Sequence, residues 1–158
     1  METPFAKRFL TKNFVSIYSN VKSTRWFLAG LPLWFNNKFV LLWVINKKGH
    51  DDGYALISID SIYRIEWESI HLHQKQIQWE ASNDLIHIKE ADMNPPKILY
   101  MLCKERRIVM LKEKDRFTMC RYIIEHIDGC MLNVKEQSSK VARRKKISIE
   151  EVSIIAWK

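Results

Sequence analysis

Two histidines separated by one residue are the first candidates for chemistry in this chain of 158 residues. His71 and His73 would share one face of a strand, as metal ligands often do, and Asp84 or His87 could complete such a site. On a helix the two imidazoles would instead point about 200 degrees apart. We interpret them as solvent-facing histidines of a connecting segment, and keep a metal-dependent enzyme as the third hypothesis for function.

Other reactive residue types are present without the spacing that catalysis needs. The acid pair Asp51-Asp52 could hold a cation, but its setting between His50 and Gly53 is typical of a tight polar turn. The sequence contains no nucleophile elbow, no glycine loop that would cradle a phosphate and no zinc-binding spacing. We therefore predict no enzyme, no catalytic residue, no metal or other cofactor, and no small-molecule substrate.

The cysteines predict no disulfide. Cys103, Cys120 and Cys130 form no CxxC pair, and an odd number leaves one over in any pairing scheme. We expect reduced and mostly buried thiols. Cys120 and Cys130 fall on neighbouring predicted strands.

Positive charge gathers at the C-terminal end of the chain. The formal net charge of +8 divides into +4 for residues 1–67, −3 for 68–94 and +7 for 95–158. The candidate nucleic-acid-binding residues are Lys140, Arg143, Arg144, Lys145 and Lys146, which we place on a hairpin between two strands. Such a hairpin could bind the phosphate backbone of RNA or DNA without sequence specificity. No aromatic residue lies among the cations, so this segment does not support recognition of single strands by stacking. Alternatively, it is a solvated turn that keeps an edge strand from aggregating.

These residues are carried by a chain that looks duplicated. The segment 57–67 reads ISIDSIYRIEW, and the segment 147–157, ninety positions later, reads ISIEEVSIIAW. At the same offset Val134 matches Val44, Leu132 matches Leu42 and Phe117 matches Phe27. Core residues persist in this way when surfaces drift, because tightly packed interiors tolerate few changes of volume. Chance similarity between strands of like pattern is the alternative.

Each half reads as a short helix followed by five strands. A polar residue and proline precede an apolar pattern at Thr3-Pro4 and again at Asn94-Pro95-Pro96, which predicts two helix starts. The predicted strands are 14–18, 26–35, 39–45, 54–59 and 62–67, then 107–111, 117–126, 130–137, 146–149 and 152–157. Only Asp60-Ser61 and Glu150-Glu151 separate the last two strands of each half, so we expect the chain to bend sharply there and to close a small barrel.

This order is similar to that of the Sm-like (LSm, Hfq-type) family of SH3-like small barrels. Gly30, Phe35-Asn36 and 39–42 resemble the first motif of that family. Asp52-Gly53-Tyr54, with Ile57, Ile59 and Ile62, resembles a group of bacterial Sm-like proteins of unassigned function. The resemblance implies a mainly β fold of two tandem five-stranded Sm-like barrels, each opened by a short N-terminal helix.

The departures argue against the RNA pocket of that family. Val40 stands where the family has an asparagine, and Asp60 and Glu150 stand where it has an arginine that contacts nucleotide. A carboxylate there would repel phosphate and gives a base no cationic plane on which to stack. The uridine site of the family is therefore not transferred to this chain.

We accordingly predict one barrel over 1–67, an ordered connector over 68–94 and a second barrel over 95–158. The predicted function is a non-enzymatic protein-interaction or self-assembly module, whose partner is a protein or another copy of the chain; non-specific RNA or DNA binding through the basic second half is the alternative. No apolar run approaches the roughly 20 residues that span a bilayer, and the N-terminus lacks the apolar segment of a signal peptide, so we expect no membrane partner and a cytoplasmic location.

Overall fold

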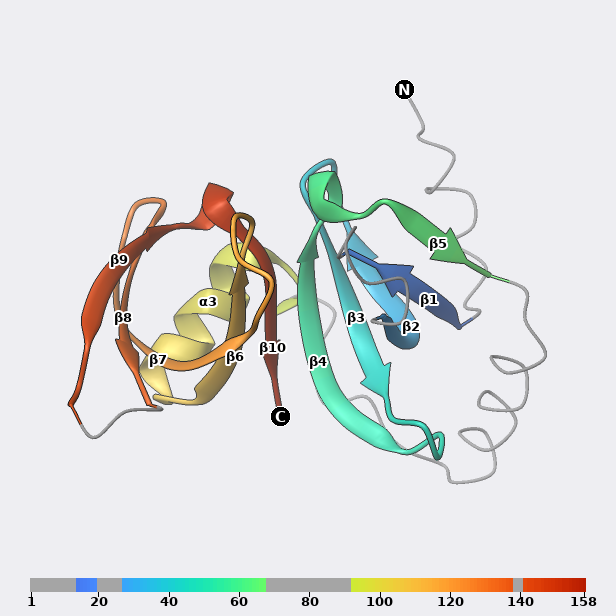
Figure 1. Cartoon of the computed structure of the whole chain (residues 1–158), viewed down its shortest axis with the longest axis horizontal. Helices are drawn as coiled ribbons and strands as arrows, with labels where there is room; N and C mark the ends of the chain where they lie inside the picture. Colours follow the sequence, from blue (N-terminus) through green and yellow to red (C-terminus); the bar gives the residue numbers. More distant parts are fainter. Residues whose placement is uncertain (1–13, 20–26, 68–91, 138–140) are drawn as a thin grey trace.

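A single antiparallel sheet of ten strands dominates the structure, a computed structural model that describes residues 14–19, 27–67, 92–137 and 141–158 (Figure 1). The strands are β1 (Val15–Tyr18), β2 (Leu28–Phe35), β3 (Phe39–Ile45), β4 (Asp51–Ser58), β5 (Arg64–Glu66), β6 (Ile108–Glu113), β7 (Cys120–Asp128), β8 (Met131–Glu136), β9 (Arg144–Ser148) and β10 (Val152–Trp157). One α-helix, α3 (Pro95–Lys104), lies in the described part of the chain. The predicted mainly β fold is confirmed.

The order of the strands repeats within the sheet. It runs β5-β1-β2-β3-β4 and continues β10-β6-β7-β8-β9, so the C-terminal half (α3 and β6–β10) copies the order of the N-terminal half (β1–β5). The two halves join where β4 pairs with β10, and the sheet stays open, with β5 and β9 at its edges. The finer prediction, two separate barrels that each begin with a helix, stays a prediction.

Most predicted elements lie where the sequence placed them. The strands 39–45 and 152–157 match in both bounds, and short 3-10 turns occupy Ile59–Ser61 and Ile149–Glu151 between the last two strands of each half. The helix after Asn94 begins as predicted, because the Asn94 side chain accepts a hydrogen bond from the Lys97 N–H at 3.1 Å. The first predicted helix and most of the connector lie outside the described residues.

Two clusters of buried apolar side chains lie on opposite faces of the sheet. The small core lies mainly in the N-terminal half and consists of Val15, Ile17, Val40, Leu42, Val44, Ala55 and Ile57, together with Ile154 from β10 of the C-terminal half. The large core fills the C-terminal half, where Ile98, Leu99 and Leu102 of α3 pack against the sheet, and extends over the far face of β3 and β4. Successive residues of β10 serve both clusters, since Ile154 lies in the small core and Ile155 in the large one.

The hydrogen bonds show how the two halves correspond. The Ile59 N–H donates to the Lys38 carbonyl and the Ile149 N–H to the Cys130 carbonyl, each at 2.8 Å. The donors lie 90 positions apart but the acceptors 92, and the register shift of β2 near Pro32 recurs in β7 near Ile124, again 92 positions later.

The predicted constant offset of ninety is therefore wrong outside the last two strands of each half. Leu132 corresponds to Val40 and Val134 to Leu42, because the connections between strands differ in length. Corrected in this way, Val40 and Leu42 of the small core match Leu132 and Val134 of the large core. Phe117 lies in the loop before β7 and has no such match.

Candidate interaction surfaces

The pairing of β4 with β10, here called the joint, connects the two halves of the sheet. Ile154 lies opposite Ile57, Ile155 opposite Leu56, Ala156 opposite Ala55 and Trp157 opposite Tyr54. The rings of Tyr54 and Trp157 stack with centroids 5.7 Å apart. Since both strands are buried here, the joint combines main-chain hydrogen bonds with apolar packing.

An ion pair lies at each end of this joint. At one end Lys158 Nζ lies 2.8 Å from Asp52, and at the other Lys114 Nζ donates to Asp60 at 2.7 Å. The hydrogen bonds from Lys114 and from the Ser58 hydroxyl hold the pKa of Asp60 below its usual range. Three of the four side chains are exposed and Lys114 is half-buried, so each pair contributes little to stability.

Among the strands of the described residues, β5 and β9 each have one edge without a partner strand. Arg143 and Ile149 lie just before and just after β9, and their backbone groups point toward β8. The Arg143 carbonyl accepts from the Glu136 N–H, and the Ile149 N–H donates to the Cys130 carbonyl. In an antiparallel ladder the direction alternates, so the N–H groups of Arg144 and Lys146 point to the free edge. Such an edge can pair with a strand of another chain.

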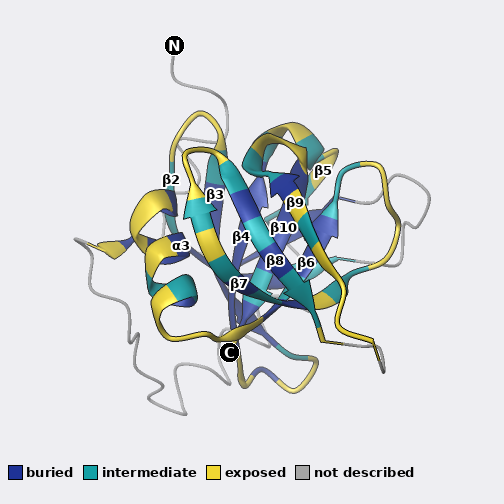
Figure 2. Ribbon diagram, turned by 90° about the vertical axis from the view of Figure 1, so that its left-hand side faces the viewer, coloured by how far each residue is buried: buried dark blue, intermediate teal, exposed yellow. Residues whose placement is uncertain are grey.

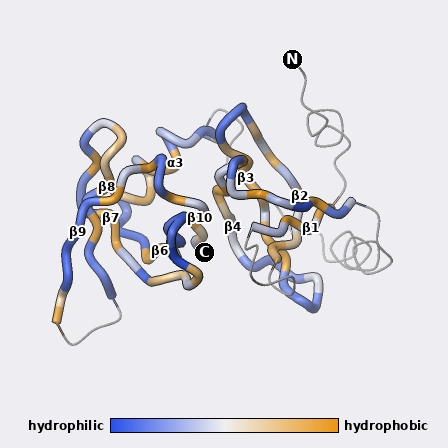
Figure 3. Tube along the Cα trace, turned by 45° about the horizontal axis from the view of Figure 1, so that its top comes forward, coloured by the Kyte–Doolittle hydropathy of each residue, from blue (hydrophilic) through white to orange (hydrophobic). Residues whose placement is uncertain are grey.

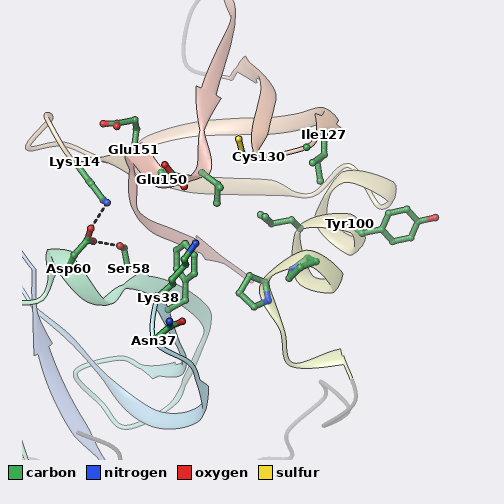
Figure 4. Close-up of a pocket in the computed structure, with 16 residues that line it drawn as sticks. Asn37, Lys38, Ser58, Asp60, Tyr100, Lys114, Ile127, Cys130, Glu150 and Glu151 are labelled. Carbon is green, nitrogen blue, oxygen red and sulfur yellow. Dashed lines mark hydrogen bonds and ion pairs between the residues drawn. The ribbon is translucent and has the colours of Figure 1, made fainter. Parts of the chain in front are cut away.

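A cleft of about 880 Å³ opens between the halves on one side of the joint (Figure 4). The 3-10 turns of both halves, the β2–β3 and β7–β8 turns and the first turn of α3 surround it. Phe39, Leu99, Ile127 and Ile149 supply apolar lining, whereas Glu150 and Glu151 bring carboxylates to it.

Asp60 and Glu150, the turn residues that the sequence comparison placed at the arginine position of the Sm-like family, both line this cleft. Lys38 and Lys114 bring ammonium groups to the cleft beside its carboxylates, and Val40 is wholly buried in the small core. The absence of the uridine site of that family from this chain stays a prediction.

The candidate nucleic-acid-binding residues do not form one hairpin tip. Lys140 lies outside the described residues. Arg144, Lys145 and Lys146 belong to β9, so they lie on a strand of the predicted β8–β9 hairpin and not in the connection between its strands. Lys145 points inward and pairs with Glu113 and the Tyr122 ring. Burial opposes its charge, but hydrogen bonds to Glu113 and Tyr122 outweigh that effect and raise the pKa of Lys145. Arg143 stays exposed just before the strand.

Sequence reasoning missed cations that neighbouring strands add beside this cluster. Arg144 and Lys146 face outward from β9, and Lys135 of β8 lies directly opposite Arg144. Arg121 of β7 projects from the same face, because Tyr122 and Ile124 point into the large core. We call these four residues, Arg121, Lys135, Arg144 and Lys146, the cationic face. The alternation of apolar and charged residues along β8 was the signal that could have revealed it.

The described part of the structure places neither a disulfide nor a metal-binding group at the cysteines and histidines considered above. Cys103, Cys120 and Cys130 are free thiols, two half-buried and one exposed, and Cys120 and Cys130 sit at opposite ends of the β7–β8 hairpin. Among the described residues no group of three His, Cys, Asp or Glu side chains could hold a metal ion. His71 and His73 fall outside the described residues.

Comparisons with family models, with curated proteins and with solved structures give no match for this chain. Within the described residues, no helix combines the length and the apolar character that crossing a membrane requires.

Proposed function

We propose that this protein is a non-enzymatic self-assembly module whose copies join head to tail, β9 of one chain pairing with β5 of the next. The observation that carries the proposal is the joint inside the chain. β4 corresponds to β9 and β10 corresponds to β5, so the β4·β10 pairing is already an example of the contact that the free edges can make.

The proposal treats each half as one Sm-like, SH3-like small barrel, with the first over 1–67, the second over 95–158 and a connector between them. The repeated strand order, the matched 3-10 turns and the corresponding core residues support this division. Sm-like subunits assemble by pairing edge strands between chains, and the present chain would contain one such contact within itself.

Copying the internal joint predicts the register between chains. Ala55 lies opposite Ala156 in the joint, and the corresponding residues are Lys145 and Glu66. The predicted contact therefore sets Lys145 opposite Glu66. The Lys145 ammonium already pairs with Glu113 of its own chain, so the internal joint, and not a new ion pair, determines the register. In the same register Arg144 lies opposite Trp67.

A proline at the free edge tests the proposal. Lys146→Pro removes an N–H that points away from β8, so the β8–β9 ladder keeps its hydrogen bonds while the edge loses a donor and gains a bulky ring. Lys146→Ala is the matched control, since it removes the same side chain and leaves the donor in place.

We expect sedimentation velocity to show the wild type and Lys146→Ala as multiples of the 18.9 kDa chain, and Lys146→Pro as the monomer. Circular dichroism and thermal unfolding would establish that all three fold alike. A wild type that stays monomeric as concentration rises, or a proline variant that assembles as the wild type does, would overturn the proposal.

A further inference from the structure

The outer face of the sheet differs sharply between the two halves. In the N-terminal half Leu41, Trp43 and Leu56 point away from the small core, and each is at most 1 % exposed. The corresponding residues of the C-terminal half are Asn133, Lys135 and Lys146, of which the first two are half-buried and the last is exposed. One copy of the duplicated face is thus apolar and covered, and the other is polar and open.

Figure 2 looks onto the end of the molecule that carries β8 and β9, where β9 has exposed and half-buried positions along most of its length. Figure 3 shows the same strand as a mainly hydrophilic trace, in contrast to the hydrophobic stretches of β3. Strands pack about 4.8 Å apart and alternate residues repeat about every 7 Å, so the cationic face brings four positive groups close together.

The arrangement of these charges does not serve the stability of the sheet. Lys135 and Arg144 lie directly opposite each other, and like charges at opposed positions destabilise antiparallel strands. Arg144 has a counter-charge, because its Nε lies 3.1 Å from a carboxylate oxygen of Glu125. In the described structure no carboxylate lies within ion-pair distance of Arg121, Lys135 or Lys146. A polyanion would supply the missing counter-charge.

We propose that the cationic face docks on the phosphate backbone of duplex nucleic acid without reading its sequence. Its described outward positions contain no Phe, Tyr or Trp on which unpaired bases could stack, which favours a duplex over a single strand. Arg121 and Lys135 lie on β7 and β8, away from the free edge of β9, whereas Arg144 and Lys146 lie on β9 itself, so this surface overlaps in part with the contact that head-to-tail assembly would use.

Binding of a fluorescent 20-base-pair DNA to the full chain tests the proposal. The variant combines Arg121→Gln, Lys135→Gln and Lys146→Gln, and glutamine at 146 keeps the backbone donor of the edge. The control combines Lys47→Gln, Lys48→Gln and Lys104→Gln, which removes the same charge from exposed positions elsewhere. The assembled mass of all proteins is checked in the same buffers.

Each phosphate contact contributes about −0.9 to the slope of log K against log salt, so four contacts predict roughly a 150-fold loss of affinity between 50 and 200 mM salt. We expect the variant to bind at least tenfold more weakly, with a slope shallower by about 3, and the control to stay within about threefold of the wild type.

Equal losses in the variant and the control would show an effect of net charge alone and overturn the proposal. The absence of duplex binding at 50 mM salt would do the same, as would binding to vesicles containing phosphatidylserine, or to polyglutamate, in place of DNA.

Discussion

At the scale of single residues, Lys112 stands out because it is buried and has no carboxylate partner at ion-pair distance in the described structure. The residue is 4 % exposed and lies opposite Ile154 in the ladder, and its ammonium group donates to the Ser153 hydroxyl at 3.3 Å. Burial lowers the pKa of Lys112, against a weaker opposing effect of Asp115. The corresponding residue of the N-terminal half is Tyr18, whose hydroxyl donates to Glu66.

Lys112→Met should raise the free energy of unfolding at pH 7 by about 1 kcal/mol, since it removes the cost of burying a charge. The unfolded chain holds this proton up to higher pH than the folded chain does. Wild-type stability should therefore rise as pH increases from the folded pKa toward the usual value of 10.5, and the variant should lose that rise.

Urea unfolding at pH 7 and 9.5 measures both effects. Lys104→Met, at an exposed position, is the control and should change neither. A variant less stable than the wild type at pH 7 would show that the ammonium group stabilises the fold, contrary to this view.

At the scale of elements, one glycine permits β4 and β10 to approach. Gly53 has φ +88, and a Cβ there would lie 2.1 Å from the Trp157 carbonyl oxygen. The Asp51 side chain fixes this bend by accepting from the Gly53 N–H and from the Trp43 indole, each at 2.8 Å.

Gly53→Ala should therefore lower the free energy of unfolding by about 3 kcal/mol, through backbone strain and the clash together. Gly129→Ala measures the backbone strain without a clash, because Gly129 has φ +58 and a Cβ added there would meet nothing within 4 Å. This variant should lower the free energy of unfolding by about 1 kcal/mol. Chemical denaturation gives both values. Equal losses would mean that the close approach at Gly53 adds nothing to the joint.

The sequence predicted elements better than it predicted their partners. Regular apolar patterning placed 39–45 and 152–157, and the cap at Asn94 placed the start of α3. The offset of ninety failed across earlier strands, because two connections differ by two residues and periodicity within a strand carries no information on loop length. The basic run 143–146 was assigned to the connection of a hairpin, because charged side chains are usually exposed. The outward side of an edge strand exposes charged side chains equally well, and Arg144–Lys146 lie on such a strand. The β4·β10 joint depends on contacts distant in sequence and had no local signal.

At the scale of the whole molecule, the two free edges differ from each other, so the proposed contact is heterologous. A chain with one β9 edge and one β5 edge forms a closed ring or an open filament, according to the rotation between successive chains. Two-fold pairing of β9 with β9 of a second copy would instead stop at a dimer. The distribution of masses, and not only the loss of the monomer, is therefore informative.

Disulfide trapping tests the head-to-tail register most directly. Glu66→Cys and Lys145→Cys would be combined in one chain whose Cys103, Cys120 and Cys130 are replaced by alanine, with circular dichroism confirming the fold. Opposed residues of this kind lie within the Cα separation that a disulfide accepts. Glu66→Cys with Arg143→Cys, shifted by two residues, is the control.

Mild oxidation of the Glu66→Cys, Lys145→Cys chain should give a ladder of covalent multiples on a non-reducing gel, and the shifted pair should give far less. Linked dimers from Lys145→Cys alone would favour β9 pairing with β9. A chain that remains monomeric under oxidation at concentrations where the wild type assembles would contradict the proposed register, and with it the central claim that the internal joint is repeated between copies.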